Sequence, residues 1–157
     1  MPDARLATSE DAAVLARLLV DFNAEFEEPC DSVEVLTERF ARILRQDTVV
    51  ALLAGESQGF ALLTLRPAIW FDGPVAALDE LYVVPAERSK GHGAALIALA
   101  REVLRRKGCP ELHINVDEVD ADAQRFYERL GFVNVEPGND YRMLCFIGST
   151  AAPSSGP

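Results

Sequence analysis

The chain has 157 residues, of which 49% are apolar and 25% are charged, and it carries a formal net charge of −10. This length matches one domain with a sizeable core, and the composition excludes a disordered, collagen-like or disulfide-built chain. The excess of acids argues against nucleic acid and anionic membranes as partners. A cationic partner is easier to accommodate.

The three cysteines lie far apart without a CxxC or CxxH spacing, which indicates reduced thiols, and we expect neither disulfides nor a metal. No segment has the pattern of a secretory signal or the roughly 18 apolar residues of a membrane span, which predicts a cytoplasmic protein. Residues 148–157 are small and polar and contain proline. We therefore expect a single folded domain over residues 1–147 and a disordered tail over 148–157.

A short strand over residues 5–7 and an amphipathic helix are the first predicted elements. Thr8 and Asp11 have the spacing of a capping box, which begins the helix. An apolar stripe over residues 15–26 repeats at spacings of three and four. Pro29 ends this helix.

A second helix and a series of strands follow. Asp31 or Ser32 caps this helix, which stops near Gln46. Beyond it, β-branched and apolar runs between short turns predict strands, and two later segments have helical spacing. These elements are strands over residues 48–54, 58–65 and 75–84, a helix over 91–107, a strand over 111–116, a helix over 119–130 and a last strand over 142–147. The sequence thus predicts a mixed α/β domain.

The turn before the helix over 91–107 is the most informative segment. Gly91 and Gly93 lack Cβ atoms, so backbone N–H groups at the helix start can approach a bound anion. The helix dipole adds about half a positive charge at the same place. This geometry suits a pyrophosphate.

Charge supports an anion at this turn. Arg88 and Lys90 lie at its edge, although an exposed loop would carry such residues as well. Residues 88–107 carry a net +5 and the remaining chain −15, a division that a solvated basic helix face would also give. Other phosphate motifs do not fit, because Leu96 occupies the third glycine position of the dinucleotide fingerprint and no Gly-Lys-Ser or Gly-Lys-Thr is present.

Two motifs resemble those of the GNAT superfamily of N-acetyltransferases. The pattern RxxGxG at residues 88–93, directly after LxVxP at residues 81–85, resembles its acetyl-CoA signature. The pattern AxxFYxxLGF at residues 123–132 is similar to its later helix motif, in which the tyrosine faces the thioester. The order of elements matches over residues 4–147, but Asp120 stands where that superfamily often has asparagine.

The resemblance implies a GNAT fold, with a central mixed, mostly antiparallel sheet that is splayed at its middle and flanked by about four helices. It also implies acetyl-CoA as co-substrate, with the pyrophosphate on turn amides and the pantetheine arm paired with strand backbone. Alternatively, Leu81, Tyr82 and Val83 are only hydrophobic core residues. The implied cofactor-binding residues are Leu81, Tyr82, Val83, Arg88, Ser89, Lys90, Gly91, His92, Gly93 and Ala94.

Acetyl transfer from a thioester to an amine needs a base, a stabilised oxyanion and a proton for the departing thiolate. The resemblance implies direct attack, without an acyl-cysteine, and makes Tyr127 the candidate general acid. Alternatively, Tyr127 only closes the core. Glu80 is the favoured base because strand alternation places it on the face of Tyr82, whereas Asp79 points with the core residues unless the strand bulges.

The sequence also offers other candidates for the base. Asp117 and Glu118, just after the strand over 111–116, are alternatives to Glu80, as is a water chain. His92 lies inside the phosphate turn and His113 inside a strand, so neither is favoured.

Acidic residues also indicate the acceptor. Seven acids and no base lie between Asp21 and Glu38, and the resemblance places this segment at the acceptor groove. We predict a small cationic primary amine, such as an aminoglycoside or a polyamine. The acids could instead only make the helix faces soluble, and the acceptor could be a peptide or protein amine. The alternative to an enzyme is a catalytically silent acetyl-CoA-binding regulatory module. A homodimer is left open. The candidate acceptor-binding residues are Phe26, Glu27, Glu28, Asp117 and Glu118.

Overall fold

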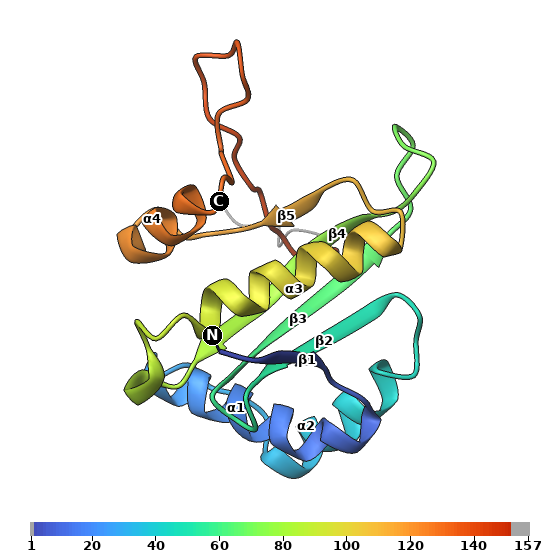
Figure 1. The fold of residues 1–157 in the computed structure, drawn as a ribbon, viewed down its shortest axis with the longest axis vertical. Coiled ribbons are helices and arrows are strands. Elements are labelled where there is room, and N and C mark those ends of the chain that lie inside the picture. The colour runs from blue at the N-terminus through green and yellow to red at the C-terminus, as the bar shows by residue number, and fades with distance from the viewer. Residues whose placement is uncertain (1, 152–157) are drawn as a thin grey trace. The chain divides into compact units, whose positions relative to one another are not determined.

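The computed structural model describes residues 2–151, and the chain divides into two units, Met1–Ile114 and Asn115–Pro157. The first unit holds a five-stranded sheet in the order β1-β2-β3-β4-β5 (Figure 1). Neighbouring strands are antiparallel except β4 and β5, which are parallel. The elements of the first unit are β1 (Ala4–Leu6), η1 (Ser9–Asp11), α1 (Ala12–Glu25), α2 (Val33–Ile43), β2 (Val49–Ala54), β3 (Gly59–Arg66), β4 (Val75–Val83), η2 (Pro85–Glu87), α3 (His92–Arg106) and β5 (Leu112–Ile114).

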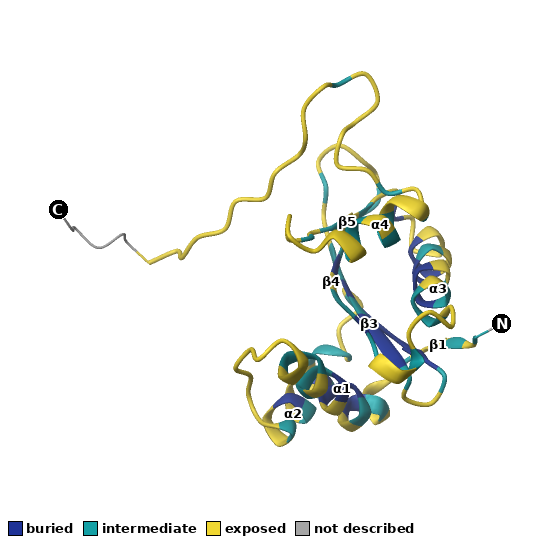
Figure 2. Cartoon of the chain, turned by 90° about the vertical axis from the view of Figure 1, so that its left-hand side faces the viewer, coloured by how far each residue is buried: buried dark blue, intermediate teal, exposed yellow. Residues whose placement is uncertain are grey.

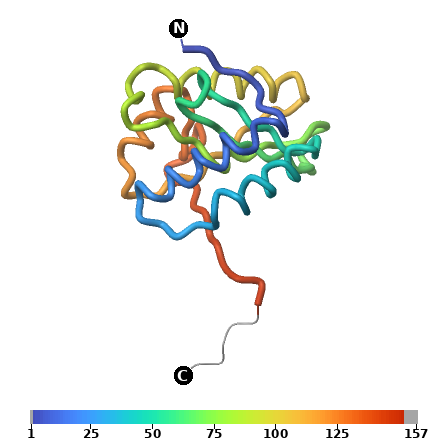
Figure 3. The backbone as a smooth tube through the Cα atoms, turned by 90° about the horizontal axis from the view of Figure 1, so that it is seen from below, coloured from blue at the N-terminus to red at the C-terminus, as the bar shows by residue number. Residues whose placement is uncertain are grey.

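Helices cover both faces of this sheet. α1 and α2 lie on one face and α3 on the other (Figures 2 and 3). On the α1 face, the cross-strand neighbours Leu53, Phe60 and Tyr82 are buried in one cluster with residues of both helices. Phe60 is fully buried, and burial of such a side chain stabilises a fold by about 1.5–3 kcal/mol. The predicted mixed α/β class is confirmed.

The predicted capping box is present at the start of η1, the 3-10 turn that leads directly into α1. The Thr8 hydroxyl accepts from the Glu10 N–H, and the Asp11 carboxylate accepts from the Thr8 N–H at 2.8 Å. Asp11 also accepts two hydrogen bonds from Arg5 of β1, at 2.8 and 2.9 Å. These bonds lower the pKa of Asp11 from 3.8 to about 2.

Asp11→Asn is therefore expected to lower the free energy of unfolding at pH 7 by about 1–2 kcal/mol. Because the native pKa lies below the unfolded one, the carboxylate stabilises the fold above pH 3.8, and this stability is lost as the pH falls through about 2. Denaturant unfolding at pH 7 and pH 2 measures this difference, with Asp3→Asn as a control. A gap between wild type and Asp11→Asn that is as large at pH 2 as at pH 7 would refute the assignment.

Both predicted helix ends in this region were too late. α1 ends at Glu25 rather than at Pro29, because Phe26 leaves the helix and Glu27 has a left-handed φ of 54°. α2 starts at the predicted cap, Ser32, but ends at Ile43 rather than near residue 46. Local turn geometry, which periodicity does not encode, sets these ends.

The second unit contains α4 (Ala121–Arg129), and the predicted last strand over residues 142–147 is wrong. Its run of apolar residues is typical of a strand, but a strand needs a neighbouring backbone, and the described part of this unit provides no ladder for it. Phe146 and Ile147 are almost fully exposed. The predicted domain over 1–147 and tail over 148–157 stay predictions, and residues 152–157 lie outside the described residues. None of the described helices is both long and apolar enough to cross a membrane.

Candidate active site

The turn between β4 and α3 has the geometry of an anion site. Pro85 opens η2, after which Ser89 and Gly91 take left-handed φ values of 63° and 91°. The first backbone N–H that bonds within α3 is that of Ala95, which donates to the Gly91 oxygen at 3.0 Å. Among the described residues, no acceptor faces the N–H groups of residues 89–94.

Six consecutive unpaired amides at a helix start can donate to phosphate oxygens, and the helix dipole favours negative charge there. Gly91 meets a steric demand as well as a conformational one, because a Cβ on it would lie 3.3 Å from Cγ of Pro2. The residues present therefore fit the pyrophosphate of acetyl-CoA as the resemblance implies.

The charged side chains of the turn are bound to protein acids. Arg88 pairs with Glu25, and Lys90 pairs with Glu87 at 3.3 Å. His92, whose side chain is largely buried, places Nε2 3.3 Å from the same Glu87 carboxylate. Lys90 and His92 together hold the pKa of Glu87 below its ordinary value.

Most of the basic charge counted in the sequence lies away from the turn. The four later bases are on or just after the C-terminal half of α3, and with a rise of about 1.5 Å per residue Arg105 lies ~20 Å along the axis from Gly91. Arg105 and Arg106 occupy the last helical turn, where the helix dipole favours cations. The net +5 of residues 88–107 therefore does not measure phosphate affinity.

β4 and β5 diverge, as a splayed sheet requires. Their ladder joins residues 76–78 to residues 112–114 only. Within the described part of the first unit, residues 80–83 pair with β3 alone. Tyr82 is nevertheless a core side chain, since it is buried and its ring stacks on Phe22 with centroids 5.0 Å apart. Only the backbone at Tyr82 is thus suited to cofactor contact, while Leu81 and Val83 are partly buried.

A β-bulge in β4 resolves the orientation of Asp79 and Glu80. Leu62 is opposite Glu80 and Leu63 is opposite Leu78, so Asp79 has no partner in β3. Its exposed carboxylate accepts a 2.7 Å hydrogen bond from the Thr64 hydroxyl. Glu80 is half-buried, and burial, with a smaller contribution from Asp79, raises the pKa of its carboxyl. A raised pKa suits a residue that must accept a proton near neutral pH.

Tyr127 lies on α4 of the second unit. Its ring makes edge-to-face contacts with Phe126 and Phe132, with centroids 5.1 and 6.2 Å apart. Burial, together with the nearby charge of Asp120, raises the pKa of the Tyr127 phenol to about 12. The phenol therefore keeps its proton at physiological pH, as a general acid must.

The remaining predicted residues of the second unit have structural partners. The Asp120 carboxylate accepts from the Ala123 N–H at 3.0 Å, so the departure from the usual asparagine serves as a helix cap. Glu118 forms an exposed ion pair with Arg142 at 3.1 Å. The Asp117 backbone oxygen accepts from the Asp120 N–H. In the first unit, His113 pairs with the Glu111 carboxylate at 3.0 Å.

The first unit thus brings together the turn, Val83 at the end of β4 and Glu25, the last residue of α1. Sequence reasoning had placed Glu25 only among the acceptor-side acids and missed its pairing with Arg88, because the two residues are 63 positions apart. The one available signal was an acid at the C-terminal end of a helix, where the dipole disfavours it. The roles of Tyr127, Asp117 and Glu118, in the second unit, stay predictions.

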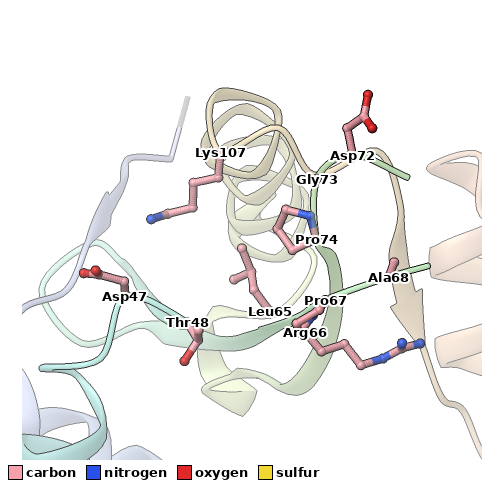
Figure 4. Close-up of a pocket in the computed structure, with 10 residues that line it drawn as sticks. All are labelled: Asp47, Thr48, Leu65, Arg66, Pro67, Ala68, Asp72, Gly73, Pro74 and Lys107. Carbon is pink, nitrogen blue, oxygen red and sulfur yellow. The ribbon is translucent and has the colours of Figure 1, made fainter. Parts of the chain in front are cut away.

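A hollow of about 490 Å³ lies elsewhere in the first unit, beside the far end of α3 (Figure 4). Its lining includes Arg66, Asp72 and Lys107, whose charged ends point apart rather than toward one another. None of residues 89–94, whose backbone N–H groups form the anion site, lines this hollow. Among the described residues, no group of three or more His, Cys, Asp or Glu could hold a metal ion.

Comparison with known proteins identifies the family. The model of the acetyltransferase (GNAT) family matches residues 14–132, and the chain therefore belongs to that family. It is 33% identical over 98 residues to the aminoglycoside N(6′)-acetyltransferase type 1 of Klebsiella aerogenes. The aligned segment covers 60% of this chain and 64% of that enzyme. The chain thus spans less than two thirds of that relative. The predicted family and fold are confirmed.

Two further similarities extend over almost the whole chain. Thialysine N-epsilon-acetyltransferase of Bos taurus is 27% identical in an alignment of 169 positions that covers 97% of this chain and 96% of that protein. The crystal structure of a proposed acetyltransferase from Arthrobacter sp. FB24 superposes with a TM-score of 0.88 at 45% identity over 95% of each chain.

Proposed function

We propose that the chain transfers the acetyl group of acetyl-CoA to a primary amine of a small cationic acceptor. The observation that carries this proposal is the turn of residues 89–94, whose six backbone N–H groups have no acceptor among the described residues. Family membership supplies acetyl-CoA as the molecule whose pyrophosphate these amides would bind.

The proposed reaction is a direct attack. Glu80 accepts a proton from the amine as its nitrogen bonds to the thioester carbonyl carbon, and the C–S bond of the tetrahedral intermediate then breaks. Tyr127 donates its proton to the departing thiolate, which leaves as free CoA thiol. The raised pKa values of both groups suit these roles, since Glu80 gains affinity for a proton and Tyr127 stays protonated.

Glu80→Gln tests the base. We expect kcat to fall by about a hundredfold, because a positioned general base contributes on this scale. The carboxyl must be ionised to act, so wild-type kcat should fall as the pH drops through the raised pKa of Glu80, and the variant should lack this contribution to the acidic limb. Ionisation of the acceptor amine affects both proteins equally. The exposed Glu56→Gln is the matched control, and an acidic limb in Glu80→Gln that is the same as in the wild type would assign the base elsewhere.

Acids at the end of α1 support a cationic acceptor. Glu27 and Glu28 are exposed beyond α1, and Phe26 beside them is 57% exposed with its ring edge-on to Phe22. Not every acid of this region is free to attract an amine, since Asp31 pairs with Arg39. The names of two relatives also specify small acceptors, an aminoglycoside in one and thialysine in the other.

An acceptor panel tests this part of the proposal. Aminoglycosides, polyamines, neutral monoamines and basic peptides are incubated with acetyl-CoA, and acetylated products are quantified by mass spectrometry at low and high salt. We expect kcat/KM to be highest for the small polycationic amines and to fall with salt for them alone, because salt screens attraction by exposed carboxylates. Preference for peptide N-termini would instead support a peptide or protein acceptor.

A further inference from the structure

A bidentate ion pair joins the end of α1 to Arg88, at the start of the turn between β4 and α3. This turn, residues 88–94, is called the cofactor turn below. The two terminal guanidinium nitrogens of Arg88 donate to the carboxylate of Glu25 at 2.7 and 2.6 Å. The third nitrogen, Nε, donates to the backbone oxygen of Val83 at 3.0 Å. All three nitrogens of this side chain are thus bound to protein groups.

Aromatic packing fixes the same pair. The Arg88 guanidinium carbon lies 5.8 Å from the centroid of the Tyr82 ring, and the same ring stacks on Phe22 of α1. Ion pairs at a surface contribute little unless their geometry is well fixed. This pair meets that condition, because it is bidentate, has a third hydrogen bond and rests beside a buried ring.

α1 alone does not explain the position of Glu25. A carboxylate at the last residue of a helix is disfavoured by the helix dipole, whereas a guanidinium beside that end is favoured. Directly after Glu25 the chain turns away at Phe26 and Glu27 into the acidic segment that precedes α2. The pair therefore holds the point from which this segment departs.

We infer that Glu25 and Arg88 are positioning residues that tether the acceptor segment, residues 26–31, to the cofactor turn, and that Arg88 is not a phosphate ligand. This inference rests on the proposed function, since it takes acetyl-CoA at the turn and an amine at the segment. It revises the sequence-based assignment of Arg88 to cofactor binding. Its neighbours in the turn keep that assignment, because the unpaired amides belong to them.

The test compares Glu25→Gln, Arg88→Gln, Arg88→Lys and the double variant Glu25→Gln/Arg88→Gln. Acceptor KM and kcat are measured with the best amine of the panel, and the Kd for acetyl-CoA is measured by calorimetry. We expect all four variants to raise acceptor KM by about tenfold, with the double variant no worse than either single one, and to leave kcat at saturating amine within about twofold. The Kd for acetyl-CoA should change by less than about threefold.

Arg88→Lys separates the tether from a simple phosphate contact. Lysine keeps the charge but cannot make the bidentate pair and the third bond, so a tether predicts that it behaves like Arg88→Gln. A lysine variant with wild-type KM, or an Arg88→Gln variant whose Kd for acetyl-CoA rises tenfold or more, would show that the arginine charge serves the phosphates and overturn the inference.

Glu102→Gln is the control, because Glu102 also pairs with an arginine, Arg106, but within one helix. If Glu25→Gln changed acceptor KM no more than this control, or if the two single effects added in the double variant, the tether would be refuted. Failure of the proposed function looks different, since the wild-type chain would then bind no acetyl-CoA or acetylate no amine, and the tether would fail with it.

Discussion

Gly91→Val is expected to weaken acetyl-CoA binding by about a hundredfold, the largest effect on cofactor affinity of any single substitution in the chain. Gly91 has a φ of 91°, a conformation that costs a β-branched residue about 1–3 kcal/mol. The strain is relieved only if the turn moves, and this movement would displace the N–H groups of residues 89–94 that are proposed to bind the pyrophosphate. Calorimetric titration with acetyl-CoA measures the change in Kd.

Gly108→Val is the matched control for this variant. Gly108 follows the other end of α3 and has a φ of 73°, and a Cβ added to it would meet open space. Both substitutions should therefore lower stability by similar amounts, but only Gly91→Val should change Kd. Equal Kd values in the two variants would show that the turn does not bind the cofactor.

Tyr127→Phe is expected to lower kcat by about a hundredfold and to leave the Kd for acetyl-CoA unchanged. Loss of the hydroxyl removes the proposed acid, whose contribution lies within the usual 10²–10⁴-fold range, and keeps the aromatic ring that contacts Phe126 and Phe132. Because the phenol pKa is raised to about 12, wild-type kcat should show no basic limb from Tyr127 below about pH 10.

The exposed Tyr141 provides the control, since Tyr141→Phe removes a hydroxyl from the same unit without touching the predicted site. Steady-state kcat over pH 6–10 and an acetyl-CoA titration distinguish the outcomes. An unchanged kcat in Tyr127→Phe, with chemistry rate-limiting, would leave Tyr127 as a packing residue.

Local sequence signals predicted most of the fold. The Thr8 and Asp11 capping box, the Ser32 cap and the glycines at residues 91 and 108 each gave a helix boundary that the structure confirms to within a residue or two. The early end of α1 escaped prediction because Glu27, a residue with no intrinsic preference for positive φ, takes that conformation. The strand predicted over 142–147 failed because a short apolar run shows only that a segment is compatible with a sheet.

The parts of the candidate site that depend on residues adjacent in sequence were predictable. The parts that depend on contacts between residues far apart in sequence were not. The anion turn follows from glycine spacing after a strand, and the structure adds unpaired amides to it. The bulge at Asp79 depends on the register between β3 and β4, which strand alternation cannot show. The pairing of Arg88 with Glu25 required the tertiary fold, and it changed the interpretation of Arg88 from phosphate ligand to tether.

The role of the basic residues near the turn also could not be predicted from the sequence alone. The net −10 is the sum of a basic α3 region and a strongly acidic remainder, and the sequence suggested that the basic part serves phosphates. In the structure, Arg88 and Lys90 pair with Glu25 and Glu87, so the proposed pyrophosphate site would depend on the backbone amides and the helix dipole. This assignment predicts weaker salt dependence of acetyl-CoA binding than a cluster of free cations would give.

Release of free thiol from acetyl-CoA, followed with a thiol reagent in the presence and absence of the amine panel, tests the central claim most directly. An acetyltransferase should release thiol in step with added amine, and acetylated amine should form in equal amount. Binding of acetyl-CoA without amine-dependent thiol release across the whole panel would contradict the proposed transfer and support a catalytically silent acetyl-CoA-binding module instead.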